Sequence, residues 1–376
     1  MNQTYNTDKM YRLPWTKEDN PTGWIEVTTF CQLKCPGCYR GLAENNPDRI
    51  HEDVGKIKKE IDDFIEKRNI QTLSIAGGEP LLYPRIKEII SYANSKQLKT
   101  RIFTNGLALS KERLERLKSI GATEFVIHID KFQDRFDLKN KLNTNELRQK
   151  YCDIFREVGD VNLGFILPVS RNNFEEMNSL LELAKENSDV VNLIVFTPYK
   201  DVVPIKNNTY NKNKVESISF EDVADTIFSV YKTPPNSFLG KITDKYKPSW
   251  MFFMPVFYGN KIVGHIDSLI YKKIQDRYYK KNNRYMVTSK GNKINLKSLM
   301  PLAFNKNIAR ILFNISKEKE KEVLRYQTIL IIDAPEKING VWELCDGCPD
   351  AMYFNEKLVP SCLLERVKKG EEILIS

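Results

Sequence analysis

The stretch "WIEVTTFCQLKCPGCYRG" (residues 24–41) joins a β-branched segment to three closely spaced cysteines, Cys31, Cys35 and Cys38. Soft thiolates select zinc, copper(I) or iron–sulfur clusters. A structural zinc site needs four ligands, whereas only three are local here and no His is nearby. The spacing therefore favours an iron–sulfur cluster with one iron left open, on a loop that follows a strand.

Short β-branched segments alternate with amphipathic helical patterns across the first half of the chain. The expected strands are 24–29, 72–76, 101–104, 125–129, 163–167 and 192–196. Alternation of this kind predicts an α/β fold with a parallel sheet. A closed eight-unit barrel needs about 250 residues, so six units predict an open, partial (βα)6 TIM-like barrel. Such barrels carry their catalytic groups after the carboxyl ends of the strands, where Cys31 lies.

The composition is that of a soluble globular protein. The chain has 376 residues, of which 41% are hydrophobic and 28% charged. No run of 18 apolar residues occurs, so we expect a cytoplasmic protein. Thiols stay reduced there, and clustered cysteines bind metal or do redox chemistry more often than they form disulfides.

Two further motifs follow the next predicted strands. "AGGEP" (76–80) ends the second strand and "TNG" (104–106) ends the third. Together with C-x3-C-x2-C, they resemble the radical S-adenosylmethionine (SAM) superfamily over about residues 22–200. The resemblance implies a [4Fe–4S] cluster on the three cysteines, SAM on its open iron, and an electron donor such as flavodoxin or ferredoxin. It also implies reductive cleavage of SAM to a 5′-deoxyadenosyl radical that abstracts a hydrogen atom from a substrate.

The same resemblance implies which residues contact SAM. Glu79 of the glycine turn would offer its carboxylate to the SAM ammonium group. Strand-end side chains would contact the ribose or the methionine part, although ordinary structural roles at strand ends compete with this for His128 and Asp130. The expected cofactor-binding residues are Gly77, Gly78, Glu79, Pro80, Tyr39, Asn105, His128, Asp130 and Phe196. One departure is Gly37, which stands before the third cysteine where many members have an aromatic residue; Tyr39 follows instead.

A second cysteine triplet, Cys345, Cys348 and Cys362, has C-x2-C-x13-C spacing and encloses a predicted hairpin, "AMYFNEKLVPSC" (351–362). It resembles the auxiliary-cluster module of the SPASM/Twitch group, with the spacing of the molybdenum-cofactor GTP cyclase. The resemblance implies a second [4Fe–4S] cluster, and a zinc site is the alternative. The seventh cysteine, Cys152, lies on the apolar side of a predicted helix and is expected in the core.

The net charge of +9 is concentrated in one segment. Residues 241–310 hold 15 Lys and Arg against 3 Asp, a net charge of +12, together with aromatic residues from Trp250 to Tyr279. Lysines that solvate an insert with an aromatic core would explain this pattern. Contact with an anionic membrane surface or an amphipathic substrate is a second interpretation. Nucleic acid is the least favoured partner, since no RNA-binding motif is present.

The sequence thus predicts three parts. They are a radical SAM core (22–205), a basic and aromatic insert or substrate-binding region (206–340) and an auxiliary-cluster module (341–376). The expected function is radical SAM chemistry on an amphipathic or lipid-like substrate. The alternatives are a peptide-modifying radical SAM maturase and, from another class, a zinc-stabilised nucleic-acid-binding module.

Overall fold

The computed structural model describes residues 5–35, 38–42, 49–133, 135–138, 143–200, 202, 215–287, 291–299, 302–318 and 320–375. The first half alternates strands with helices. The strands are β2 (Thr22–Glu26), β3 (Thr72–Ala76), β4 (Lys99–Thr104), β5 (Glu124–His128), β6 (Asn162–Val169) and β7 (Val191–Pro198). The helices are α1 (Val54–Arg68), α2 (Ile86–Ser95), α3 (Lys111–Ser119), α4 (Thr144–Val158) and α5 (Phe174–Glu186).

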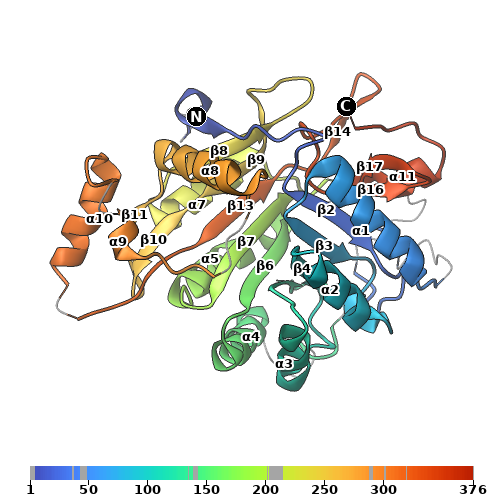
Figure 1. Ribbon diagram of the computed structural model, residues 1–376, viewed down its shortest axis with the longest axis horizontal. Helices are drawn as coiled ribbons and strands as arrows, with labels where there is room; N and C mark the ends of the chain where they lie inside the picture. The colour runs from blue at the N-terminus through green and yellow to red at the C-terminus, as the bar shows by residue number, and fades with distance from the viewer. Residues whose placement is uncertain are drawn as a thin grey trace.

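Strands β2 to β7 pair in sequence order and run parallel. The helices lie outside the curved sheet (Figure 1). Helix α1 forms because Ile57, Ile61 and Phe64 recur at helical spacing, and all three are buried against the sheet. The predicted partial α/β barrel is confirmed.

The central sheet continues beyond residue 205, where the sequence placed the end of the core. Its ten strands run in the order β1-β8-β9-β13-β7-β6-β5-β4-β3-β2. Beyond residue 205 the sheet gains β8 (Pro235–Gly240), β9 (Pro248–Phe253) and β13 (Thr328–Ile332), and β1 (Tyr11–Arg12), from the start of the chain, pairs with β8 at the edge. β13 is parallel to β7 and antiparallel to β9. Helix α7 (Phe220–Tyr231) precedes this extension.

The aromatic run of the basic segment is explained by this extension. β9 lies between β8 and β13, and its Trp250, Phe252 and Phe253 are buried. A strand covered on both faces reads as a continuous apolar run. These aromatic side chains therefore form core, as the first of the three interpretations of this segment supposed.

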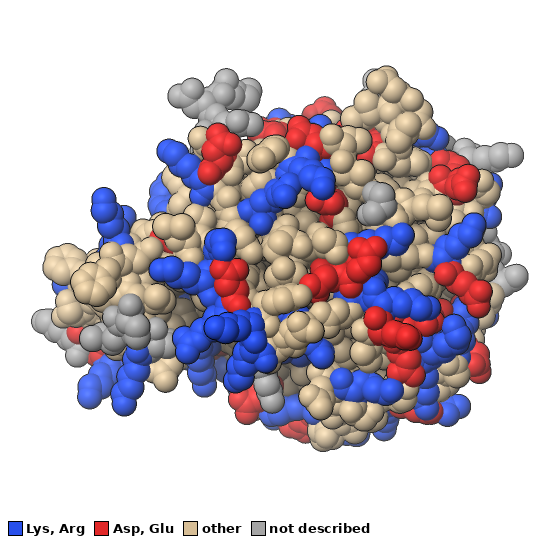
Figure 2. All heavy atoms as spheres, turned by 45° about the horizontal axis from the view of Figure 1, so that its top comes forward, with Lys and Arg blue, Asp and Glu red and all other residues tan. Residues whose placement is uncertain are grey.

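A smaller lobe projects from the sheet (left in Figure 1). Its elements are β10 (Pro255–Tyr258), β11 (Lys261–His265), α9 (Leu296–Leu299), α10 (Lys306–Ser316) and β12 (Leu324–Tyr326), whereas α8 (Ser268–Asn282) contacts β1 and β8 of the central sheet. On α8 the side chains of Lys272, Lys273, Lys280 and Lys281 are exposed, whereas Tyr271 is buried. In Figure 2, Lys and Arg predominate on this lobe, and the rest of that face mixes both signs of charge.

The C-terminal part contains two hairpins and a short helix. The first hairpin is β14 (Glu336–Ile338) with β15 (Val341–Glu343), and the second is β16 (Ala351–Phe354) with β17 (Lys357–Pro360), followed by α11 (Leu364–Lys368). Asn355 and Glu356 form the second turn with φ of 47° and 62°. The hairpin expected before Cys362 is thus present. Among the helices of the described ranges, none is long and apolar enough to span a membrane.

Candidate active site

One cavity of about 350 Å³ lies at the carboxyl ends of the parallel strands, and both cysteine triplets line it. Most of the sequence-predicted site residues meet there. Those that line the cavity are Cys31, Cys35, Cys38, Tyr39, Gly77, Gly78, Asn105, His128, Asp130, Cys345, Cys348 and Cys362. Residues more than 300 positions apart in the chain therefore face one space.

The glycine turn after β3 packs directly on the chain that leads to Cys31. Gly78 N–H donates to Thr28 O and Glu79 N–H to Phe30 O, each at 2.7 Å. A Cβ on Gly77 would lie 2.4 Å from Thr28 O, and one on Gly78 would lie 2.3 Å from Phe30 O. Only glycine permits this approach, so the turn fixes the position at which the cysteine loop begins.

The Glu79 carboxylate does not line the cavity, which differs from its expected use on a SAM ammonium. It is fully buried and accepts hydrogen bonds from Thr104 Oγ1 and Asn105 N at 2.7 Å and from Leu81 N at 3.0 Å. Burial raises its pKa, while the three donors oppose the rise. Glu79 therefore ties the end of β3 to the end of β4, and Pro80 is buried behind the turn.

Asn105 connects that turn to the first triplet. Its Nδ2 lies 3.8 Å from Cys31 Sγ as a donor, and its Oδ1 accepts from Leu107 N at 2.9 Å. Burial raises the pKa of Cys31 to about 11, and the Asn105 donor acts in the opposite direction. The thiol is protonated at neutral pH, so a metal would bind there with release of a proton.

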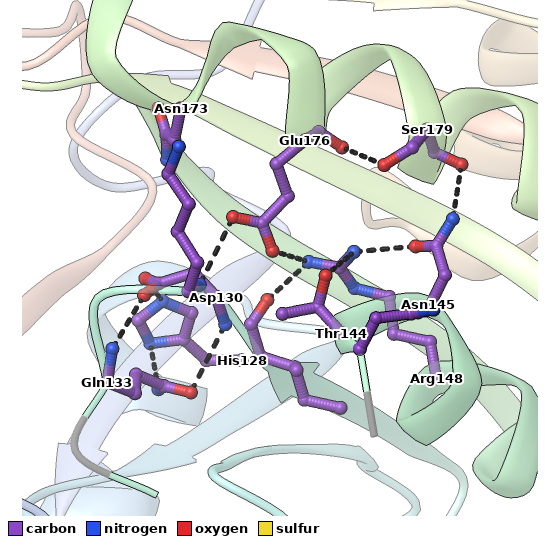
Figure 3. Close-up of polar contacts among 12 residues, drawn as sticks. His128, Asp130, Gln133, Thr144, Asn145, Arg148, Asn173, Glu176 and Ser179 are labelled. Atoms are coloured by element: carbon purple, nitrogen blue, oxygen red, sulfur yellow. Dashed lines mark hydrogen bonds and ion pairs between the residues drawn. The ribbon is translucent and has the colours of Figure 1, made fainter. Parts of the chain in front are cut away.

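A second polar group follows β5 (Figure 3). His128 Nε2 lies 2.6 Å from Asp130 Oδ2, and Gln133 Nε2 lies 3.0 Å from His128 Nδ1. Burial alone would raise the pKa of Asp130, but His128 and the N–H groups of Phe132 and Gln133 lower it below its usual value. The carboxylate is thus held ionised and oriented at the cavity.

Behind this group, α4 and α5 contribute a buried ion pair (Figure 3). Arg148 Nη2 donates to Glu176 Oε1 at 2.7 Å, and Glu176 Oε2 accepts from Lys131 N at 3.2 Å. The pair fixes the chain that leaves β5, and therefore the direction in which His128 and Asp130 point.

Of the predicted contacts, Phe196 does not line the cavity, whereas Tyr39 lines it and also contacts Glu26 and Trp24. Phe196 is fully buried in the core, and its neighbours on β7, Val195 and Thr197, line the cavity instead. Side chains alternate along a strand, so Phe196 faces the outer helices, and Thr197 replaces it as the candidate from β7. The Tyr39 hydroxyl donates to Glu26 Oε1 at 3.3 Å, while its ring packs edge-on to Trp24.

The second triplet is fastened to the barrel by segments distant in sequence. Lys241 and Cys345 form an antiparallel bridge, with Ile242 N donating to Leu344 O at 3.0 Å. Burial raises the pKa of Cys345 to about 11. Among the described residues, no three His, Cys, Asp or Glu side chains are close enough to hold a single metal ion.

Sequence reasoning missed a charged group on the cavity wall. Lys241 Nζ lies 2.7 Å from Asp333 Oδ2 and 2.8 Å from Glu343 Oε2, and Lys200 Nζ lies 3.1 Å from Asp333 Oδ1. Lys241 follows β8, Asp333 follows β13 and Glu343 ends β15, so only the fold brings them together. The only indication in the sequence was that each of these residues lies at or just after the carboxyl end of a strand.

Comparison with known proteins places the first half of the chain. The radical SAM superfamily matches residues 25–202. Residues 25–202 form a radical SAM domain. The match decides against the zinc-stabilised nucleic-acid-binding alternative for this half of the chain.

Several known proteins are similar to parts of the chain. A probable GTP 3′,8-cyclase of Methanocaldococcus jannaschii is 25% identical over 217 residues, which cover 54% of this chain and 67% of the cyclase. The subtilosin biosynthesis protein AlbA of Bacillus subtilis is 34% identical over 95 residues, 25% of this chain and 20% of AlbA. PqqA peptide cyclase of Granulibacter bethesdensis is 28% identical over 178 residues, 44% of each chain. The alignments with AlbA and the peptide cyclase thus span less than half of those proteins.

Solved structures resemble the chain over about half its length. SuiB of Streptococcus suis bound to its precursor peptide SuiA aligns with a TM-score of 0.42 and 22% identity, covering 53% of this chain and 43% of SuiB.

The residues of the radical SAM domain fit the cofactors that such domains carry. Cys31, Cys35 and Cys38 provide three thiols on one cavity, which Gly77 and Gly78 also line. Three thiolates and an open position suit a [4Fe–4S] cluster with SAM beside it. Radical SAM domains also require a reductant and a substrate.

Proposed function

We propose that the protein is a radical SAM enzyme that cleaves SAM reductively and abstracts a hydrogen atom from an amphipathic substrate. A [4Fe–4S] cluster on Cys31, Cys35 and Cys38 would supply the electron, delivered by a donor such as flavodoxin or ferredoxin, and SAM the 5′-deoxyadenosyl radical. The observation that carries the proposal is the shared cavity, because both triplets line it at the strand ends. Cys345, Cys348 and Cys362 would hold a second [4Fe–4S] cluster.

Within this proposal the chain's own residues position the reactants. Gly77 and Gly78 line the cavity and would offer backbone to SAM, and their lack of a Cβ lets the turn pack on Thr28 and Phe30. Glu79 acts indirectly, since its carboxylate fixes the amide of Asn105 and the hydroxyl of Thr104. Asp130, oriented by His128, is a cavity-lining carboxylate near Cys35 and is available to a ribose or an ammonium group.

The substrate class follows from the cavity wall. Apolar side chains from the inner faces of β5, β7 and β13 form one part, including Val126, Val195 and Leu330. Lys241 and Asp333 add charge at the strand ends. A molecule with an apolar part and a charged group matches both. We propose that the three predicted parts of the chain, divided at residues 205 and 340, have different roles, and that residues 206–340 complete the cavity wall.

A peptide is the second candidate substrate, favoured by the relatives named for bacteriocin biosynthesis and peptide cyclisation. A peptide segment with apolar and charged side chains is itself amphipathic. Contact of the lysine-rich helix α8 with an anionic membrane is a separate proposal, supported by its exposed lysines alone, since the aromatic residues of β9 are buried.

The test is anaerobic reconstitution with iron and sulfide, followed by SAM and dithionite. The expected product is 5′-deoxyadenosine. Asp130→Asn should weaken SAM binding, while Asp137→Asn, which alters a half-buried carboxylate paired with Arg135 away from the cavity lining, should not. Protein with its N-terminal cluster intact that forms no 5′-deoxyadenosine, even with cell extract as a substrate source, would disprove the proposal.

A further inference from the structure

A buried arginine lies directly behind the second cysteine triplet. Arg68 is the last residue of α1 and is 1% exposed. Its Nη2 donates to the main-chain oxygens of Gly347 at 3.3 Å and Cys348 at 3.0 Å. The guanidinium therefore contacts the turn that carries one of the three thiols.

The other fully buried arginines of the described chain each form an ion pair with a carboxylate, and Arg68 does not. Arg40 pairs with Glu26 and Glu365, Arg135 with Asp137, and Arg148 with Glu176. No ion pair of Arg68 is found among the described residues, and its buried Nε and Nη1 have no hydrogen-bond partner there.

An uncompensated buried cation is costly, because burial removes the water that would solvate it. Carbonyl oxygens of Gly347 and Cys348 solvate one nitrogen and neutralise no charge. The groups that act electrostatically on Arg68 and can become negative are Cys348, Tyr353, Glu18 and Asp350. Among the described residues neither carboxyl group forms an ion pair with the guanidinium, whereas the Cys348 carbonyl oxygen is in direct contact with it. A cluster on three thiolates carries net negative charge, which increases by one when the cluster is reduced.

The turn is held in register with Arg68 by two more side chains. Asn20 Nδ2 donates to Gly347 O at 3.1 Å, and Thr22 Oγ1 donates to Pro349 O at 2.6 Å. Cys348 itself has a φ of 34°, which is uncommon for a residue other than glycine. These contacts fix the backbone without Arg68, so its charge needs a separate explanation.

We propose that Arg68 is a positioning residue for a cluster on Cys345, Cys348 and Cys362, and that its unpaired guanidinium offsets the cluster's charge and raises its reduction potential. The inference rests on the proposed second cluster. A nearby cation favours the reduced state more than the oxidised one, because the reduced cluster is more negative, and burial strengthens the effect by lowering the local dielectric.

The experiment uses the full chain with Cys31, Cys35 and Cys38 changed to Ala, so that only the second triplet can hold iron. Arg68→Gln and Arg68→Lys are compared with Arg148→Gln, which removes an equally buried arginine that has its own carboxylate. Iron, sulfide and an EPR-monitored redox titration are measured. At the parent midpoint, Arg68→Gln should lower the ratio of reduced to oxidised cluster about tenfold, or about 59 mV for one electron.

Arg68→Lys keeps the charge and should shift the potential less, and Arg148→Gln should leave it unchanged. An unchanged potential in Arg68→Gln, or an equal shift in Arg148→Gln, would overturn the inference. If Arg68→Gln fails to hold iron, the titration of Arg68→Met, which also removes the charge, decides, and an unchanged potential there overturns it as well. A parent protein without iron at the second triplet would reject the second cluster itself, and the role of Arg68 with it.

Discussion

The two cysteine triplets line one cavity but are built in opposite ways. The first lies on a single loop after β2, and the thiols of Cys31, Cys35 and Cys38 are all partly exposed. Its support comes from the ends of neighbouring parallel strands, through the glycine turn and Asn105. The second is distributed over a turn and a hairpin, with Cys348 buried.

The contacts that hold each cysteine triplet to the barrel also differ. Side chains from the start of the barrel, among them Asn20 and Arg68, hold the second triplet's turn by its carbonyl groups. Lys241 holds the adjoining strand β15 through Glu343. The cysteines of the first triplet are thus partly exposed on a single loop, whereas the turn of the second is bound to the barrel through its carbonyl groups.

Removing each set of thiols should give the largest effects. Cys31, Cys35 and Cys38 changed together to Ala should halve the iron of reconstituted protein, from about eight to about four per chain, and abolish 5′-deoxyadenosine formation. Changing Cys345, Cys348 and Cys362 should also halve the iron but leave SAM cleavage. Iron and sulfide analysis with product chromatography tests both results.

Cys152→Ala is the matched control, because this cysteine is buried on α4 away from the cavity. Its iron content should equal that of the wild type. Zinc bound at the second triplet, with about four iron in the wild type, would contradict the expectation of two clusters.

Much of this comparison could be predicted from sequence, because its signals are local. β-branched runs located the parallel strands, and cysteine spacing located both triplets. The hairpin before Cys362 was recognisable because an Asn-Glu pair separates two short apolar runs. Gly77 and Gly78 were recognisable because "AGGEP" at the end of a predicted strand resembles a motif of the radical SAM superfamily.

The sequence could not predict the contacts between segments that are distant along the chain. Lys241, Asp333 and Glu343 meet only because β8 and β13 join the central sheet. Arg68 resembles any basic residue at the end of a helix, where a positive charge is favoured in any case. The extension of the sheet was itself concealed, because a covered strand such as β9 has no alternating pattern.

Lys241→Met should be the most damaging single substitution near the second triplet. It would leave Glu343 and Asp333, exposed by 7% and 9%, without their shared partner. Removal of one member of a buried ion pair costs about 3–5 kcal/mol. Urea unfolding of the apoprotein measures the loss.

Lys247→Met is the control, since Lys247 also approaches Glu343 but is 51% exposed at 3.5 Å. An exposed pair contributes about 0–1 kcal/mol. Equal destabilisation by the two substitutions would show that burial of Lys241 does not set its contribution.

A methyl group added at a glycine next to one triplet should reduce iron binding at that triplet alone. The new Cβ in Gly78→Ala meets Phe30 O at 2.3 Å, and the one in Gly347→Ala meets Thr16 backbone atoms from 2.8 Å. Each should cost about 1–3 kcal/mol by overpacking. Gly78→Ala should lower iron at the first triplet and Gly347→Ala at the second, measured in variants that keep only one triplet.

Gly340→Ala separates the clash from backbone strain. Gly340 has a φ of +82°, like Gly347 at +64°, but no atom lies within 4 Å of its new Cβ. It should cost only the left-handed penalty of about 1–2 kcal/mol and leave iron at both triplets unchanged. Loss of iron in Gly340→Ala would attribute the Gly347 effect to strain.

The smallest expected effect concerns Asn105, the neutral counterpart of Arg68 at the first triplet. Its Nδ2 donates to Cys31 Sγ at 3.8 Å, a long contact that favours the thiolate without adding charge. Asn105→Ala should lower the potential of the first cluster by less than Arg68→Gln lowers that of the second, because a neutral donor acts only at short range. Asn105→Asp keeps an acceptor for Leu107 N but adds a negative charge, so its shift should exceed that of Ala. EPR titrations in the variant lacking Cys345, Cys348 and Cys362 test the order, and a larger shift for Ala than for Asp would show that Asn105 acts by shaping the loop.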